Sequence, residues 1–515
     1  MKKKLSAIFN TILDRPVYFF ILLVLVFAIS RLATWFYPIN SDHFIFYYVG
    51  KIFAQGGTLY VAAWDHKPPM IFVFNAFLYF LFGGSLVWHR IFLTVLTILD
   101  IYLFYKLAQI VIGKLGFDKN NHLLKIVLIL YVFFRNLSQF TSSGNNTENF
   151  GLIFLLLMYL SFFWFLQKYN RWFLVLLGAC LSVLFFLKGT FALLALPIAV
   201  ELVLSKRGFK NIVLDFLAIA LPFLLHILVW VWYFWAHNAV GDFIIATFTF
   251  SSKYLKSTWA GHVSPQGIFI LILLPLLVPL FIFIIRFLKD IRLIKKSQIY
   301  RFLFFALLAD LIIAAMMGAF YAYYFLIFFP IFMLIIIYYR EIFAKTVEEK
   351  SNEILRSAQN DKNKKSLMLG ILILGMILSL GISYKQFYNQ FWGSSHLEQE
   401  EFIQIVNYVK DHSNKNDKIT VYTYGATLYW LADRDAGSRF VSASVLLLDE
   451  RENYGFNLSD TYISDLEKSR PKYAVLPRDP DDLYYQNRKI TDYLQSNFVS
   501  QKTFDNFIVA RNKNI

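Results

Sequence analysis

The feature that most constrains this chain is a series of long apolar blocks separated by short loops rich in lysine and arginine. About 20 apolar residues are needed to cross the hydrocarbon core of a bilayer, and many of the blocks approach that length. Of the 515 residues, 58% are hydrophobic and only 16% are charged, which leaves too little polar surface for a soluble protein of this size. The pattern predicts a mostly α, polytopic transmembrane helical bundle.

Assigning the basic loops to the cytoplasm predicts eleven membrane spans. The predicted spans are 17–36, 90–112, 124–137, 150–166, 172–187, 190–204, 212–235, 267–287, 302–317, 320–339 and 367–384. In this arrangement the protein is a multi-pass protein of the plasma membrane, with its N-terminus in the cytoplasm and its C-terminus outside. The apolar run Met70–Phe82 is short for a span and predicts an interfacial or re-entrant helix.

The net charge of +16 is concentrated in the apolar part of the chain. From Lys385 onward there are 16 basic and 18 acidic residues, so the preceding part carries the other 34 basic and 16 acidic residues. Because most of that excess lies in short loops between apolar blocks, it fits the positive-inside rule and excludes a nucleic-acid surface. The single cysteine, Cys180, allows no intramolecular disulfide and no cysteine-based metal site.

The chain is predicted to have two domains. Residues 1–385 form the transmembrane domain, whose first outer loop is 37–89, and its inner loop 340–365 is polar and predicted to be flexible. Residues 386–515 are predicted to form a small α/β domain outside the membrane, since short helical and strand patterns alternate there. The expected helices are 398–412 and 489–498, and the expected strands are 418–424, 472–476 and 507–510.

The first outer loop carries the strongest chemical signal. Asp42 follows a span closely, and a carboxylate at the membrane face either serves a site, as a general base or a cation ligand, or is a solvated loop residue. Lys67 precedes two prolines that fix its backbone, so it suits a lipid phosphate, although an interfacial lysine that snorkels fits equally. His43, Asp65 and His66 are either supporting or metal-ligating residues, or merely polar ones.

The first outer loop resembles that of the multi-spanning glycosyltransferases of the C superfold. The residues that carry the resemblance are, in order, Asp42, Gly56, Tyr60 and Asp65-His66-Lys67-Pro68-Pro69. The resemblance is closest to bacterial relatives of dolichyl-phosphate-mannose–protein mannosyltransferases and of lipid A aminoarabinose transferase. Such enzymes move a sugar from a polyprenyl-phosphate carrier to an acceptor on the outer face of the membrane.

Three later stretches are similar to the same family: Gly144–Glu148, Leu187–Thr190, and Tyr323-Tyr324 followed by Pro330. Two departures stand out. His43 occupies a position where many relatives have glutamate, and the histidine usual before the late tyrosine is absent.

The resemblance implies an inverting hexosyl or pentosyl transferase of the bacterial cell envelope. Its partners would be membrane lipids, a polyprenyl-phosphate sugar donor, and a glycan, lipid or protein acceptor. Asp42 and Glu148 would be catalytic and would hold any divalent cation, Mg²⁺ or Mn²⁺, while Lys67, Lys188 and Arg90 would bind the donor phosphate. The ordinary alternatives are that Glu148 caps its span, Lys188 lies at the interface and Arg90 anchors the second span.

Two other classes remain open from the residues alone. A transporter or lipid flippase would explain the many spans, but it predicts charges at mid-membrane depth and paired broken helices. The acidic candidates instead gather at span ends on one side, which favours an interfacial enzyme. A non-catalytic receptor with an outer domain would not require the pattern from Asp42 to Lys67.

Overall fold

The structure is a computed structural model, and it describes residues 11–36, 43–116, 118, 122–205, 207–254, 285, 287–317, 321–349, 376–385, 388, 394–423, 425–451, 453–479 and 481–515. The chain divides into two compact units. Unit 1 comprises Met1–Tyr37, Arg90–Ile227 and His262–Phe387, and unit 2 comprises Pro38–His89, Leu228–Gly261 and Tyr388–Ile515. The predicted first outer loop and the predicted C-terminal domain therefore belong to one compact unit, although they are far apart in the sequence.

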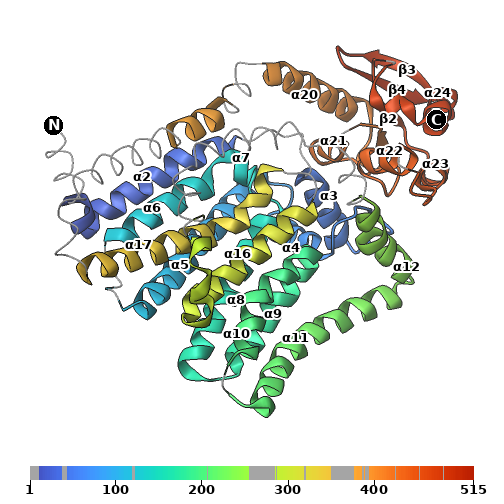
Figure 1. The fold of residues 1–515 in the computed structure, drawn as a ribbon. Helices are drawn as coiled ribbons and strands as arrows, with labels where there is room; N and C mark the ends of the chain where they lie inside the picture. The colour runs from blue at the N-terminus through green and yellow to red at the C-terminus, as the bar shows by residue number, and fades with distance from the viewer. Residues whose placement is uncertain are drawn as a thin grey trace. The chain divides into compact units, whose positions relative to one another are not determined.

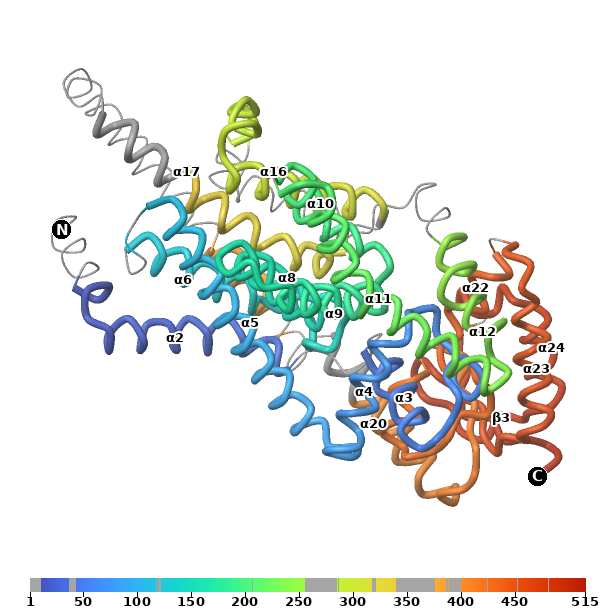
Figure 2. Tube along the Cα trace, turned by 90° about the horizontal axis from the view of Figure 1, so that it is seen from below, coloured from blue at the N-terminus to red at the C-terminus, as the bar shows by residue number. Residues whose placement is uncertain are grey.

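The regular elements described in unit 1 are all helices. Its elements are α2 (Pro16–Trp35), α5 (Leu86–Lys114), α6 (His122–Asn136), α7 (Ser138–Thr141), α8 (Thr147–Lys168), α9 (Trp172–Leu187), η1 (Gly189–Ala195), α10 (Leu196–Val203), α11 (Phe209–Ala236), η4 (Ile291–Lys295), α16 (Gln298–Met317), η5 (Ala322–Phe328) and α17 (Phe329–Glu349). The first turn of α5 and the last turns of α11 are counted with unit 2. Helix α6 packs between α2 and α17 (Figure 1), and α8 lies along α9 (Figure 2).

Six helices among the described residues are long and apolar enough to cross a membrane: Pro16–Trp35, Leu86–Lys114, Thr147–Lys168, Phe209–Ala236, Gln298–Met316 and Ala322–Tyr339. The prediction of a multi-span helical bundle is thus confirmed. The number eleven is not confirmed, because several predicted spans are short helices, such as the 15-residue α6. The predicted span 267–287 lies largely outside the described residues, and so does the first half of the predicted span 367–384.

The lipid-facing character of the bundle is visible in its exposed residues. Phe20 and Leu25 on α2, and Leu221 and Leu225 on α11, are half or more exposed. By contrast, most of α8 is buried within the unit. The outer helices thus expose large apolar side chains, and α8 is covered by its neighbours. This arrangement suits a bundle surrounded by lipid.

Helices α9 and α11 approach each other closely at Gly178. A Cβ atom there would lie 2.1 Å from the carbonyl oxygen of Ile219 and 2.8 Å from Cγ of Pro222. Small residues permit such approaches between membrane helices. We expect Gly178→Ala to push the helices apart and to lower the free energy of unfolding by about 1–3 kcal/mol.

The midpoint of thermal unfolding of the detergent-solubilised protein measures this effect. Gly381→Ala is the matched control, because a Cβ atom at Gly381 would have no atom within 4 Å. Equal midpoints for the two variants would show that the close approach at Gly178 contributes nothing.

Unit 2 combines helices with a small mixed sheet. Its elements are α3 (His43–Ala54), α4 (Met70–Phe82), α12 (Val240–Ile244), the π-helix η2 (Ile245–Phe250), α20 (Ser394–His412), β1 (Ile419–Val421), α21 (Ala426–Ala432), α22 (Ser444–Arg451), α23 (Leu458–Ser469), β2 (Tyr473–Pro477), η6 (Leu483–Gln486), α24 (Arg488–Asn497), β3 (Phe498–Thr503) and β4 (Phe507–Asn512). The strand order is β1-β2-β4-β3, with β1 parallel to β2 and the other pairs antiparallel. Strands β2, β4 and β3 are labelled in Figure 1.

The prediction of a small C-terminal α/β fold is confirmed, with one missed strand. The predicted helices correspond to α20 and α24, and the three predicted strands correspond to β1, β2 and β4. Strand β3 was not predicted because only its first residue is buried, so it lacks the apolar alternation of a half-buried strand. Helix α17 also continues to Glu349, into the predicted inner loop 340–365, and the remainder of that loop lies outside the described residues.

Within unit 2, helix α3 is attached to the C-terminal residues. The buried Lys51 ammonium lies 3.5 Å from a carboxylate oxygen of Asp433 and 3.4 Å from one of Asp435. The hydroxyl of Tyr48 accepts a hydrogen bond from the Ala436 amide at 2.7 Å. The ring of Tyr47 packs against Trp430. These contacts make one packed body of two segments that the sequence predicted in separate domains.

Candidate functional site

The predicted base Asp42 lies outside the described residues. Its neighbour His43 is the first residue of α3 and is buried. The geometry of the first outer loop is therefore described from His43 onward.

Lys67 lies in a tightly held turn of unit 2. The Tyr60 hydroxyl donates a hydrogen bond to the Lys67 carbonyl at 2.8 Å, and the Lys67 amide donates to Oδ1 of Asp65 at 2.9 Å. Its ammonium lies 3.0 Å from Nε2 of His66. Pro69 then precedes α4 directly. The backbone of Lys67 is thus fixed on both sides, as the two prolines predicted.

Tyr60 is the centre of that turn. Burial raises the pKa of its hydroxyl well above the ordinary value, so the group remains protonated and available as a donor. The hydroxyl also accepts a hydrogen bond from Thr247 at 3.3 Å. Its ring packs on Phe234 and Phe243. A fully buried tyrosine in a rigid aromatic setting positions the Lys67 backbone.

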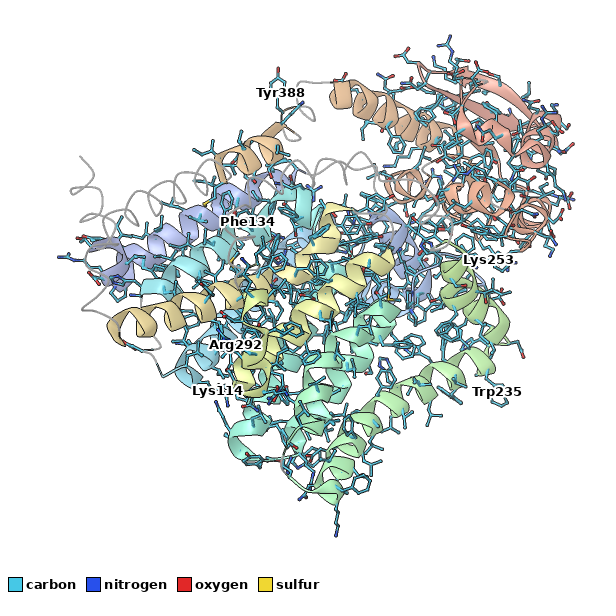
Figure 3. The ribbon with its side chains drawn as sticks, in the orientation of Figure 1. Lys114, Phe134, Trp235, Lys253, Arg292 and Tyr388 are labelled. Carbon is cyan, nitrogen blue, oxygen red and sulfur yellow. The ribbon has the colours of Figure 1, made fainter. Side chains whose placement is uncertain are left out.

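The segment after η2 closes over His66. Oγ of Ser251 donates to the His66 carbonyl at 3.1 Å, and the rings of Phe250 and Tyr254 lie beside the imidazole. Lys253, labelled in Figure 3, reaches the C-terminal residues, where its ammonium binds the Tyr454 carbonyl and lies over the ring of Phe456. The predicted pair Asp65 and His66 therefore lies in a covered turn.

Glu148 lies in the first turn of α8 and is fully buried in unit 1. The side chain of Asn146 caps the helix by accepting from the Asn149 amide at 2.8 Å, as asparagine commonly does. One carboxylate oxygen of Glu148 accepts from the Lys188 ammonium at 2.8 Å, and the other accepts from the Thr147 hydroxyl at 2.8 Å. Because α8 and α9 are antiparallel neighbours, the start of one and the end of the other meet at one end of the pair.

Lys188 completes this cluster. It lies in extended backbone between α9 and η1, as the predicted break between spans requires. Its ammonium lies 3.7 Å from the ring centroid of Tyr324 on η5, a close cation–π contact. Three of the stretches that resemble the family, around Glu148, Lys188 and Tyr324, thus meet in one place, although they are widely separated in the sequence.

The described residues offer no ready metal centre. No group of three histidine, cysteine, aspartate or glutamate side chains gathers within the described ranges. Both carboxylate oxygens of Glu148 already accept hydrogen bonds, so a cation there would have to displace Lys188 or Thr147. The arrangement does not fit a bound cation at Glu148, and a divalent cation stays a prediction that depends on Asp42.

Arg90 lies in unit 1 on α5. Its guanidinium donates to the Trp35 carbonyl at the end of α2. It therefore attaches the predicted first and second spans to each other, and a role in phosphate binding stays a prediction.

A buried polar network near Glu148 was not predicted. Nε of Arg135 donates to the carboxylate of Asp100 at 2.9 Å, and a terminal nitrogen of the same guanidinium lies 2.7 Å from that carboxylate in an ion pair. The same guanidinium donates to Thr141, whose hydroxyl donates to Asn149 beside the cap of α8. The available signal was the presence of charged residues inside predicted spans, which are costly unless they serve structure or function.

The predicted basic loops also come together in unit 1, away from Glu148. Asp215 accepts from Arg171 and Arg207, and Glu201 accepts two hydrogen bonds from Arg301. These residues lie just before α9, in α10, around the start of α11 and at the start of α16. A cavity of about 320 Å³ lies there, and another of about 580 Å³ lies beside β2; neither is lined by a predicted site residue.

Part of the chain is similar in sequence to a known family. Residues 66–233, about one third of the chain, match the family model "Dolichyl-phosphate-mannose-protein mannosyltransferase". The matched range contains Lys67, Arg90, Glu148 and Lys188. No curated protein matches the chain by sequence.

Two solved structures are similar over nearly the whole chain. ArnT from Cupriavidus metallidurans bound to undecaprenyl phosphate has a TM-score of 0.57 at 11% identity, covering 95% of this chain and 97% of that one. The same protein in the apo state has a TM-score of 0.56 at 11% identity, with the same coverage. The chain has the fold of ArnT. The C-superfold resemblance expected from the sequence is thereby confirmed at the level of fold.

Proposed function

We propose that this protein is a glycosyltransferase of the C superfold that moves a hexose or pentose from a polyprenyl-phosphate carrier to an acceptor at the outer face of the plasma membrane. The observation that carries the proposal is the buried cluster of Glu148, Lys188 and Tyr324. It unites three stretches that the family resemblance singled out, in a chain whose fold matches a structure that holds undecaprenyl phosphate.

The proposed reaction is a single displacement with inversion. An acceptor hydroxyl attacks the anomeric carbon, its oxygen forms the new glycosidic bond, and the bond from that carbon to the carrier's phosphate oxygen breaks. Asp42 takes the proton of the hydroxyl, and the carrier leaves as polyprenyl phosphate. Lys67 and Lys188 offer ammonium groups to the phosphate, whose negative charge increases as the bond breaks. Glu148 holds Lys188 in place and orients the acceptor.

The proposal is tested with the purified full-length protein in liposomes that contain undecaprenyl phosphate carrying a radiolabelled hexose or pentose. With cell-envelope extract as the acceptor source, we expect the label to move to the acceptor and undecaprenyl phosphate to accumulate. Movement of the intact labelled lipid between leaflets without release of undecaprenyl phosphate would show a flippase instead. If the protein shows no sugar transfer and no lipid movement with any donor, the proposal is wrong.

Glu148→Gln is expected to lower the transfer rate by about 10–100-fold, because it removes the charge that balances Lys188 and weakens the placement of that ammonium. Transfer at saturating donor measures the effect. Glu201→Gln is the matched control, since Glu201 is a buried carboxylate paired with Arg301 away from this cluster. Equal losses of transfer in the two variants would remove Glu148 from the site.

A further inference from the structure

Arg31 is a buried cation in unit 1 that the proposed reaction does not yet use. It lies one turn before the end of α2, and only 3% of it is exposed. Its Nε donates to Thr94 at 3.3 Å, and one terminal nitrogen donates to Oδ1 of Asn136 at 3.2 Å. Both partners are neutral, so neither offsets the charge of the guanidinium.

The charges around Arg31 do not cancel. The nearby carboxylate of Asp100 is paired with Arg135, through a hydrogen bond and an ion-pair contact. The carboxylate of Glu148 is taken by Lys188. Among the described residues, Arg31 has no carboxylate within ion-pair distance, and the three charges of Arg31, Arg135 and Asp100 sum to one positive charge. Within a membrane-spanning bundle, such an excess is costly unless an anion balances it.

The remaining terminal nitrogen of Arg31 faces the segment that leads to Glu148. Gly144 begins that segment with a φ of +90°, a conformation that favours glycine. A Cβ atom there would lie 3.6 Å from this nitrogen and 3.6 Å from Cβ of Leu93, so the bare backbone of Gly144 lets the chain approach the guanidinium closely. The uncompensated cation therefore lies against the same short stretch of chain that positions the proposed site.

We propose that Arg31 binds the phosphate of the polyprenyl-phosphate carrier, an inference that rests on the proposed function. The guanidinium presents planar N–H donors that suit phosphate oxygens, and in a low-dielectric setting the interaction is strong. The donor phosphodiester carries one negative charge, which would cancel the excess positive charge. Helix α2 also exposes apolar side chains such as Phe20 and Leu25 toward the lipid, so a polyprenyl tail can lie beside it.

The competing explanation is that Arg31 only fastens α2 to α5 and α6 through Thr94 and Asn136. Binding of undecaprenyl phosphate and of the uncharged alcohol undecaprenol to the purified protein in nanodiscs separates the two explanations. We expect Arg31→Gln to weaken the binding of undecaprenyl phosphate by 10–100-fold. The affinity for undecaprenol should stay within twofold of the parent's. If the variant binds both lipids equally more weakly, or binds both as the parent does, the inference is overturned.

Matched variants sharpen this test. Arg15→Gln removes an exposed arginine at the other end of α2 and should bind both lipids as the parent does. Thr94→Val removes one hydrogen bond between α2 and α5 but keeps the cation, so it should bind undecaprenyl phosphate as the parent does. A loss of affinity like that of Arg31→Gln overturns the inference. If Arg31→Gln fails to fold, Arg31→Lys decides. Lysine keeps the positive charge but lacks the planar set of guanidinium donors. We expect Arg31→Lys to bind undecaprenyl phosphate at least fivefold more weakly and undecaprenol as the parent does. Binding of undecaprenyl phosphate as in the parent overturns the inference.

The binding assay needs no turnover, so the two proposals fail separately. A parent protein that transfers sugar, with an Arg31→Gln variant that binds undecaprenyl phosphate normally, refutes the role of Arg31 and leaves the proposed function intact. A parent that neither binds undecaprenyl phosphate nor transfers sugar refutes both proposals.

Discussion

Replacing Asp42 with asparagine is expected to lower the rate of sugar transfer by about 10²–10⁴-fold, the usual contribution of a positioned general base. The amide has nearly the shape of the carboxylate but cannot take a proton from the acceptor hydroxyl. Because His43 occupies the next position, no second carboxylate is adjacent that could replace Asp42.

The measurement is transfer at saturating donor and acceptor, with folding checked by size-exclusion elution and thermal midpoint. Asp242→Asn serves as the control, since Asp242 lies in α12 of the same unit and only approaches Arg439 at 4.0 Å. We expect the control to transfer within twofold of the parent. Near-normal transfer by Asp42→Asn in a folded protein would show that the base is elsewhere.

Asp100→Leu is expected to produce the largest loss of stability, about 3–5 kcal/mol, because it leaves the buried guanidinium of Arg135 without its counter-charge. Asp100 and Arg135 are each at most 1% exposed and form an ion pair that includes a hydrogen bond from Nε of Arg135. Removing both charges in Asp100→Leu/Arg135→Met should recover most of the loss, since a buried pair and a packed apolar pair are often of similar stability.

Unfolding in mixed detergent micelles, followed as a function of denaturing detergent, measures these differences. Asp310→Leu is a matched control, because Asp310 is a buried carboxylate on α16 for which the described residues provide no hydrogen-bond partner. Its replacement should be neutral or stabilising. A cost at Asp310 equal to that at Asp100 would show that burial, and not pairing with Arg135, decides the outcome.

The elements that the sequence predicted well are those with local signals. Helix α4 has the predicted bounds Met70–Phe82, because Pro69 precedes it and Gly83 follows it with a positive φ. The break between α9 and η1 falls at Lys188, where Lys-Gly interrupts an apolar run. In both places a residue with its own backbone preference ends a run that would otherwise continue.

The partners of the site residues could not be predicted in the same way. Nothing local to Glu148 indicates that Lys188 and Thr147 occupy its two oxygens, because that depends on how α8 packs against α9. No local pattern predicted that the hydroxyl of Tyr60 binds the carbonyl of Lys67. Tertiary packing selects these pairs, and the family resemblance predicted candidate site residues without predicting which of them touch.

The attachment of α3 to the C-terminal residues also affects the order of events during synthesis. Lys51 and its partner Asp433 are 382 residues apart. At roughly 5–20 residues per second, the first loop would emerge roughly 20–80 s before the carboxylates that balance Lys51. Over that interval, the turn that carries Lys67 would belong to a unit 2 that still lacks its C-terminal residues. The loop closest to the proposed chemistry would then be among the last parts of the protein to become rigid, so a nascent or truncated chain would insert in the membrane long before it could act.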